Sequence, residues 1–184
     1  MNKIWEQVKD FAAIAHEGQK RKYINEPYIN HPIRVSAYCQ RYTNSLSIAA
    51  AALLHDVLED TPVTANEMES FLKGIMSDGE TKHTMRLVKD LTDVYTHAAW
   101  PHMNRRWRKE KENDRLAKTH PDAQTVKYAD IIDNTKDIVD SGDDFAPKYL
   151  QECRAILQRI TKGNAEMYRA AIEAVDEGLK KTLH

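Results

Sequence analysis

The sequence predicts one all-α domain, and three observations support this fold class. Apolar residues recur at helical spacing along most of the chain, whereas no stretch alternates apolar and polar residues as a half-buried strand does. The chain has 184 residues, the length of one domain, and no Ser/Gly-rich linker divides it. Its 41% hydrophobic and 30% charged residues are typical of a folded protein and exclude a disordered chain. We therefore expect a single helical bundle over residues 1–184.

The N-terminal segment predicts a helix, a loop and a second helix. Residues 4–16 place apolar side chains on one helical face, and Gly18 is suited to end that helix. Residues 19–30 are polar, rich in tyrosine and interrupted by a proline, so a loop is expected there. Pro32 suits the first turn of the next helix, which should reach about residue 42.

The most apolar segment is predicted to be a buried central helix. Residues 48–54 are rich in alanine and leucine, and Ser45 or Ser47 is suited to cap the helix that contains them. The segment is not taken as a strand because it is alanine-rich and flanked by turn signals. Thr61 and Pro62 end this region of the chain.

Six further helices are predicted after that break. Thr64 and Glu67 have the spacing of a capping box, and proline and glycine residues separate the later elements. The expected helical ranges are 64–74, 79–93, 98–118, 122–140, 145–161 and 164–182. The last range is amphipathic, which fits either core packing or the interface of a homodimer.

Composition argues against several classes of partner. The 27 Lys and Arg residues balance 28 Asp and Glu residues, so no overall field favours nucleic acid or an anionic membrane. No window approaches the ~20 apolar residues of a membrane span, and the N-terminus lacks the pattern of a signal peptide, so a cytoplasmic protein is expected. Cys39 and Cys153 are too few for a disulfide framework and are expected to be buried free thiols.

Four titratable residues directly follow the most apolar helix: His55, Asp56, Glu59 and Asp60. Charges in such a place are costly unless they are paired or bind a metal. On a continuous helix, His55 and Glu59 share one face and Asp56 and Asp60 share a neighbouring one. Imidazole and carboxylate together suit a divalent transition metal, and a further carboxylate can act as general acid or base. The alternative is a solvated helix end without a site.

Two other places are candidates to complete this site. His31 precedes Pro32 at a predicted helix start. Asp130 lies in an otherwise apolar stretch, and on a helix it forms a polar stripe with Asp133, Asn134 and Asp137. If this stripe faces the protein interior, it indicates a cleft; if it faces solvent, it indicates no site. The residues alone do not decide between these two orientations.

Three segments resemble the HD-domain metal-dependent phosphohydrolases. They are AHEGQKRKYINEPYINHP at 15–32, AAALLHDVLEDT at 50–61 and TVKYADIIDNT at 125–135. HDxxED after an apolar helix, with GQxR…PYxxHP before it and KxAD after it, more narrowly resembles the hydrolase domain of RelA/SpoT stringent-response enzymes and the small alarmone hydrolases. The resemblance implies a helical HD domain that removes the 3′-pyrophosphate from guanosine tetra- or pentaphosphate, leaving GDP or GTP.

The resemblance also implies roles for individual residues. The family's metal ligands, which usually hold Mn²⁺, fall on His31, His55, Asp56 and Asp130. Its pair that activates and positions the attacking water falls on Glu59 and Asp60. Contacts to the nucleotide substrate fall on Arg21, Lys22, Lys127 and Asn134.

The chain departs from the family pattern near the substrate residues. KYADIIDNTKD stands where the synthetase-linked enzymes usually have KLADRLHNMRT, and the loop after Lys22 is one residue longer. These differences do not affect the expected metal ligands, but they leave the identity of the substrate undetermined. The alternatives are an HD-type phosphatase acting on another nucleotide, such as NADPH, and a non-enzymatic interaction protein on the HD fold.

One basic segment lies outside these motifs. Residues 104–118 combine several arginines and lysines with Trp107, close in sequence to Trp100. Such a segment fits a solvated helix face, the lining of a polyphosphate cleft or a nucleic-acid surface. The balanced overall charge disfavours nucleic acid.

Overall fold

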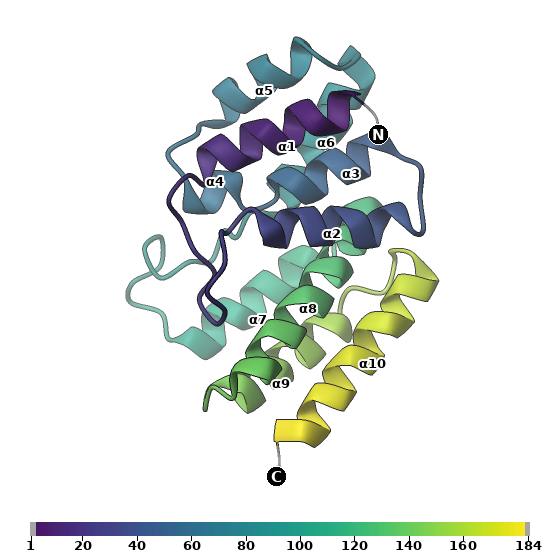
Figure 1. Cartoon of the computed structure of the whole chain (residues 1–184). Helices are drawn as coiled ribbons and strands as arrows, with labels where there is room; N and C mark the ends of the chain where they lie inside the picture. The colour runs from purple at the N-terminus through teal and green to yellow at the C-terminus, as the bar shows by residue number, and fades with distance from the viewer. Residues whose placement is uncertain (1–2, 183–184) are drawn as a thin grey trace. The chain divides into compact units, whose positions relative to one another are not determined.

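The structure is a computed structural model that describes residues 3–182. Within this range the chain forms helices and no strand, which confirms the all-α prediction (Figure 1). The loop before α2 contains one isolated bridge between Lys20 and Pro27. The helices are α1 Lys3–Ala15, α2 Asn30–Gln40, α3 Leu46–Leu54, α4 Val57–Asp60, α5 Ala65–Lys73, α6 Asp78–Leu91, α7 Arg105–Leu116, α8 Pro121–Ser141, α9 Ala146–Leu157 and α10 Ala165–Thr182.

The chain divides into two compact units, one ending at Thr92 and the other beginning at Asp93. The first contains α1 to α6 and the second contains α7 to α10. A single domain over residues 1–184 stays a prediction. None of the helices in the described range is long and apolar enough to cross a membrane.

Helix α3 forms the core of the first unit. Its residues from Ser47 to Leu54 are all buried, and it packs against α1, α2 and α6. A helix that is apolar on every side is stable only when other elements surround it, which explains this central place. The Ser45 side chain accepts a hydrogen bond from the backbone N–H of Ile48, so Ser45 is the cap of this helix.

Two predicted helix boundaries, the start of α7 and the end of α3, were wrong. The helix expected from residue 98 begins at Arg105, because Asn104 caps α7. In the segment before it, the backbone N–H groups of Val94 and Tyr95 donate to the buried Glu112 carboxylate. The central helix ends at Leu54, and a separate short helix, α4, follows after a two-residue turn. The capping box at the start of α5 is confirmed.

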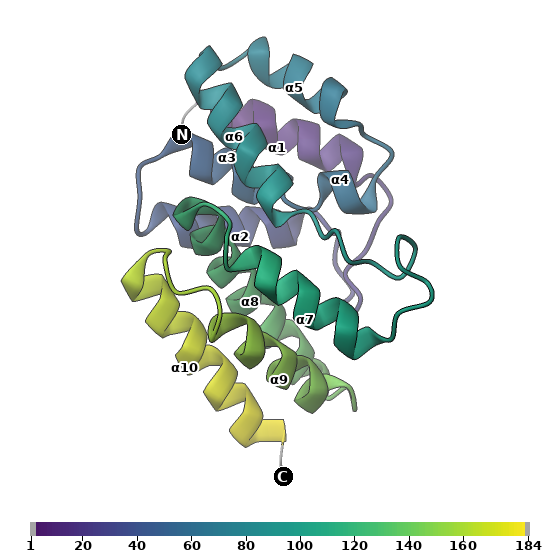
Figure 2. The ribbon, with the colours of Figure 1, turned by 180° about the vertical axis from the view of Figure 1, so that it is seen from behind.

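Helix α8 is the central element of the second unit, where it packs against α9 and α10, while α7 packs against α9 (Figure 2). Pro121 lies in its first turn, and Gly142 ends it in the left-handed conformation with φ +66°. Asp130, Asp133 and Asp137 are only 5%, 1% and 5% exposed. The polar stripe of this helix is therefore buried, which favours the first of the two alternatives left open by the residues.

Candidate metal centre

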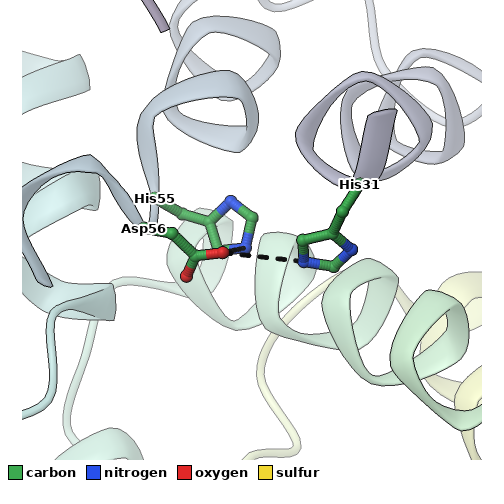
Figure 3. Close-up of side chains that lie close together, drawn as sticks. All are labelled: His31, His55 and Asp56. Atoms are coloured by element: carbon green, nitrogen blue, oxygen red, sulfur yellow. Dashed lines mark ion pairs between the residues drawn. The ribbon is translucent and has the colours of Figure 1, made fainter. Parts of the chain in front are cut away.

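Three side chains converge at the start of α2 and the end of α3 (Figure 3). One donor atom from each of His31, His55 and Asp56 lies within 4.8 Å of the other two. Asp56 Oδ2 is 3.2 Å from His55 Nε2 and 3.7 Å from His31 Nε2. Three of the four predicted metal ligands are therefore close together in the first unit.

The packing of α2 on α3 brings these donors together. His31 is the second residue of α2, His55 is the C-cap residue of α3, and Asp56 precedes the first residue of α4. Because α4 is a separate helix, His55 and Asp56 lie in the turn between two helices and not on one continuous helix as expected. Both histidines are almost fully buried, with 1% and 3% exposure, whereas Asp56 is partly exposed.

Hydrogen bonding defines which nitrogen of His55 is available to a metal. His55 Nδ1 lies 2.8 Å from the backbone oxygen of Ala52. A carbonyl oxygen can only accept, so Nδ1 carries the hydrogen and Nε2 is the nitrogen that faces Asp56. A neutral Nε2 and a carboxylate oxygen both present lone pairs, and a cation between them satisfies both. The donor set of two imidazoles and a carboxylate thus fits a divalent metal ion.

Tyr28 joins this centre to the following carboxylate. Its hydroxyl lies 2.6 Å from Asp56 Oδ2 and 3.1 Å from Asp60 Oδ2. Its ring stacks on His16 with the centroids 4.6 Å apart and meets His31 edge-on at 6.1 Å. Tyr28 was not among the predicted site residues. The sequence feature that could have indicated it is its position three residues before His31, in a polar loop. It is placed to orient Asp56.

Glu59 and Asp60 lie on α4, within one turn of Asp56. Their backbone N–H groups both donate to the Asp56 carbonyl oxygen, at 3.1 and 2.9 Å, and so tie α4 to the turn. Partial burial raises the pKa of Asp60, the Asp56 carboxylate raises it further, and the hydrogen bond from Tyr28 opposes this rise. Gln19 also donates to the Asp60 carbonyl oxygen at 2.7 Å, which fastens the preceding loop to α4.

The two basic residues of the loop take different positions. The Arg21 guanidinium lies 5.5 Å from the centre of the Tyr28 ring, in a cation–π arrangement. Lys22 is exposed, and its ammonium group donates to the Tyr23 hydroxyl at 3.0 Å. Of this predicted pair, Arg21 is therefore linked through Tyr28 to the metal centre, whereas Lys22 contacts its own neighbour.

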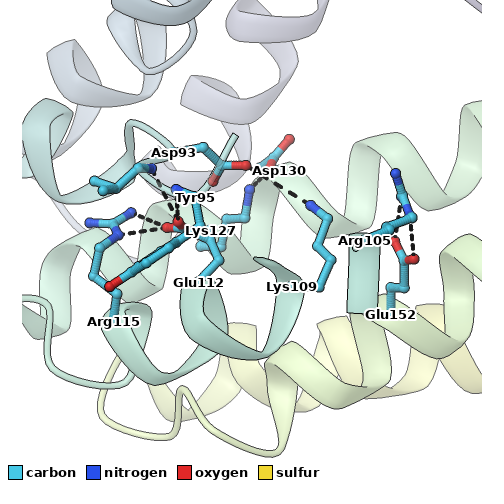
Figure 4. A network of polar contacts seen from close by, with 10 residues as sticks. Asp93, Tyr95, Arg105, Lys109, Glu112, Arg115, Lys127, Asp130 and Glu152 are labelled. Atoms are coloured by element: carbon cyan, nitrogen blue, oxygen red, sulfur yellow. Dashed lines mark hydrogen bonds and ion pairs between the residues drawn. The ribbon is translucent and has the colours of Figure 1, made fainter. Parts of the chain in front are cut away.

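The remaining predicted residues lie on α8, in the second unit, and Figure 4 shows two of them, Lys127 and Asp130. Lys127 Nζ lies 2.8 Å from Asp130 Oδ2, and Asn134 Nδ2 donates to Asp130 Oδ1. Lys127 and Asn134, both predicted to contact substrate, thus hold the carboxylate of a predicted metal ligand. Coordination of the metal by Asp130 stays a prediction.

Comparison with known proteins identifies the family of the chain. The family described as "HD domain" matches residues 28–135, more than half of the chain and the range that contains all four predicted ligands. Guanosine-3′,5′-bis(diphosphate) 3′-pyrophosphohydrolase MESH1 of Mus musculus is 33% identical over 135 residues, which is 72% of this chain and 68% of that protein. The Homo sapiens protein of the same name matches to the same extent.

A bacterial relative and a solved structure are similar over different lengths. The bifunctional (p)ppGpp synthase/hydrolase SpoT of Escherichia coli strain K12 is 49% identical over 55 residues, 30% of this chain and 8% of that protein. A structure described as a metazoan orthologue of SpoT that hydrolyses ppGpp matches 97% of this chain and 98% of its own, with a TM-score of 0.79 and 24% identity. That structure shares the fold. Together with the match over residues 28–135, these findings show that the chain belongs to the HD-domain family.

Proposed function

We propose that this chain is a metal-dependent hydrolase that removes the 3′-pyrophosphate from guanosine tetra- and pentaphosphate, leaving GDP or GTP. The observation that carries the proposal is the convergence of donor atoms from His31, His55 and Asp56 within 4.8 Å. The mouse and human relatives, which match 72% of the chain, are named for this activity. A nucleotide with a 3′-pyrophosphate is therefore the substrate class that the similarity favours.

The metal is held by His31, His55 and Asp56, with Asp130 proposed as a fourth ligand and Mn²⁺ as the ion. The hydrogen bond from His55 Nδ1 to Ala52 supports this assignment, because it leaves Nε2, on the side of Asp56, as the nitrogen that would bind the ion. When bound, the ion supplies a Lewis acid that activates water and offsets negative charge on the phosphate oxygens. Imidazole and carboxylate ligands suit Mn²⁺ as well as other divalent metals.

Glu59 and Asp60 are proposed to act on the attacking water. Glu59 accepts the proton that the water loses as it attacks the phosphorus, and Asp60 holds the water in position. Their place on α4, directly after Asp56, supports these roles. Tyr28 holds the Asp60 carboxylate near Asp56 through its hydroxyl.

Four residues are proposed to contact the substrate. Arg21 stacks on the nucleotide or pairs with its phosphates, since a guanidinium can do both, and Lys22 adds positive charge beside it. Lys127 neutralises phosphate, and Asn134 contacts the ribose, in addition to the bonds that both make to Asp130. A cytoplasmic location and a homodimer stay predictions from the sequence.

Glu59→Gln tests this proposal. Glutamine keeps the shape of the side chain but cannot accept the proton, so hydrolysis should fall by the ~10²–10⁴-fold typical of general acid–base catalysis. The measurement is pyrophosphate release from guanosine 3′,5′-bis(diphosphate) at saturating Mn²⁺, with metal content determined in parallel. Glu69→Gln is the matched control, because Glu69 lies in the same unit and is paired with Lys73 on the surface of α5.

The outcomes separate the candidate functions. Equal rates for wild type and Glu59→Gln would contradict the catalytic role of Glu59. Release of phosphate from NADPH, with no pyrophosphate released from the guanosine substrate, would replace the proposed substrate with another nucleotide. If wild type cleaves neither compound, the proposed hydrolysis is wrong and a non-enzymatic role gains support.

A further inference from the structure

A groove between α7 and α9 of the second unit is lined by residues to which the proposed reaction assigns no role. Its volume is about 500 Å³, which lies within the ~300–1,000 Å³ of typical small-molecule sites. None of the predicted catalytic, metal-binding or substrate-binding residues lines it. Two carboxylates and five cationic side chains line it. The cations are those of Arg105, Arg106, Lys109, Lys148 and Arg159.

Two ion pairs fix the walls of this groove. Arg105 Nε and Nη2 donate to the two carboxylate oxygens of Glu152 at 2.8 and 2.7 Å, so the first turn of α7 is joined to α9 by a paired contact (Figure 4). Arg159 Nη1 donates to Asp114 Oδ1 at 2.7 Å and joins the other end of α7 to the segment after α9. The paired contact of Arg105 with Glu152 holds a fixed geometry, whereas the Arg159–Asp114 contact is a single bond between exposed side chains. The wall formed by Arg105 and Glu152 is therefore defined before any ligand arrives.

The other three cations are held less tightly than Arg105 and Arg159. Within residues 3–182, neither Arg106 nor Lys148 forms an ion pair, although Lys148 Nζ lies 5.8 Å from the centre of the Phe145 ring. Lys109 Nζ forms one long ion pair, with Asp93 at 3.9 Å. Arg106 and Lys109 are one helical turn apart on α7, and Lys148 belongs to the facing helix α9. Cations arranged on both walls of a groove suit a ligand that carries several negative charges.

One amide oxygen of a residue that lines the same groove has no hydrogen-bond partner. Asn113 Oδ1 is shielded from solvent and accepts no hydrogen bond from the described residues. A buried acceptor without a donor costs free energy, and such groups in folded proteins call for an explanation. A turn of this side chain toward the groove would pair it with a hydroxyl or amino group, and Gln151 lines the same groove.

We propose that the groove between α7 and α9 is a second binding site, and that its ligand is a phosphorylated nucleoside. Arg106, Lys109 and Lys148 bind the phosphates, and the amides of Asn113 and Gln151 bind the sugar or the base. The volume favours a single nucleotide over a macromolecule. This site does not depend on the proposed hydrolysis, since it shares no residue with the metal centre.

Calorimetric titration of the full chain with GTP and with inorganic tripolyphosphate tests this site. Arg106→Gln combined with Lys109→Gln removes two cations from α7, where Arg106 is exposed and Lys109 is partly exposed, so neither belongs to the core. The control combines Arg169→Gln with Lys180→Gln, two exposed residues of α10 that carry the same charge. We expect the groove variant to bind both probes at least about tenfold more weakly, because charge-assisted hydrogen bonds are lost, and the control to match wild type.

Several results would overturn the proposal. If wild type binds neither probe at millimolar concentrations, the groove is not such a site. If the groove variant and the control bind GTP equally, the nucleotide binds elsewhere, the metal centre included. Single-stranded RNA that binds through the same two cations far more tightly than GTP would show that the ligand is not a small molecule. The titration measures binding and not hydrolysis. A failure of the proposed hydrolysis would therefore not alter these outcomes.

Discussion

Tyr28→Phe removes a single hydroxyl from the metal centre and leaves the aromatic ring in place. The ring contacts with His16 and Arg21 do not require the oxygen, so the loop before α2 should keep its position. What is lost is the hydroxyl that lies 2.6 Å from Asp56 Oδ2 and 3.1 Å from Asp60 Oδ2. The substitution therefore isolates the part that this hydroxyl plays in orienting two carboxylates.

The size of the effect follows from the nature of the lost contact. A hydrogen bond to a charged group contributes about 1.5–3 kcal/mol, which corresponds to roughly tenfold to 150-fold in an equilibrium constant. Removing a partner that orients a metal ligand typically costs about 10–100-fold in metal affinity or activity. We expect Tyr28→Phe to bind Mn²⁺ more weakly than wild type by a factor within this range. Hydrolysis by the variant should be reduced when Mn²⁺ is below saturation.

Titration of the metal-free protein with Mn²⁺ is the assay, and Tyr23→Phe is the matched control. Tyr23 lies in the same loop, but its hydroxyl contacts Lys22 and not the metal centre. Unchanged Mn²⁺ affinity in Tyr28→Phe would refute the idea that the hydroxyl orients Asp56. An equal loss in both variants would refute it as well, because the loss would then report on the loop as a whole.

Three further predictions concern other parts of the chain. Asp56→Ala should bind less Mn²⁺ than wild type after equal loading; the same metal content in both proteins would remove Asp56 from the ligand set. Arg21→Ala should raise the KM for the nucleotide and leave the metal content unchanged, whereas unaltered kinetics would contradict its contact with substrate. Burial raises the pKa of the Cys39 and Cys153 thiols to about 12. Iodoacetamide at about pH 8 should therefore modify neither in the folded protein and both after unfolding, as mass measurement would show.

Local patterns in the sequence were sufficient to predict most of the helices. The apolar run after Ser45 predicts a buried central helix, and the Thr64–Glu67 spacing predicts a capping box that the structure contains. Pro121 and Gly142 likewise mark the two ends of α8. These features depend on groups within one or two turns of one another, and for that reason the order of residues alone reveals them.

The chemistry of the candidate centre could also be anticipated in part from the sequence. His55 and Asp56 stand out because titratable residues directly follow an apolar helix. His31 and Asp130 entered the predicted ligand set through resemblance to a family, since a histidine before a proline or a single buried aspartate has no distinctive local signal. The structure brings His31 to the other two, and the place of Asp130 in the ligand set rests on the resemblance.

What only the tertiary structure decided is how these groups meet. The packing of α2 on α3 sets His31 beside Asp56, and the end of α3 at Leu54 puts the His55–Asp56 pair in a turn. The bridging hydroxyl of Tyr28 follows from the path of a loop whose sequence shows that it is polar and rich in tyrosine but not where each tyrosine points. Residue type and spacing determine which groups can bind a metal, but their distances depend on which helix faces bury each other, and that is a property of the whole folded unit.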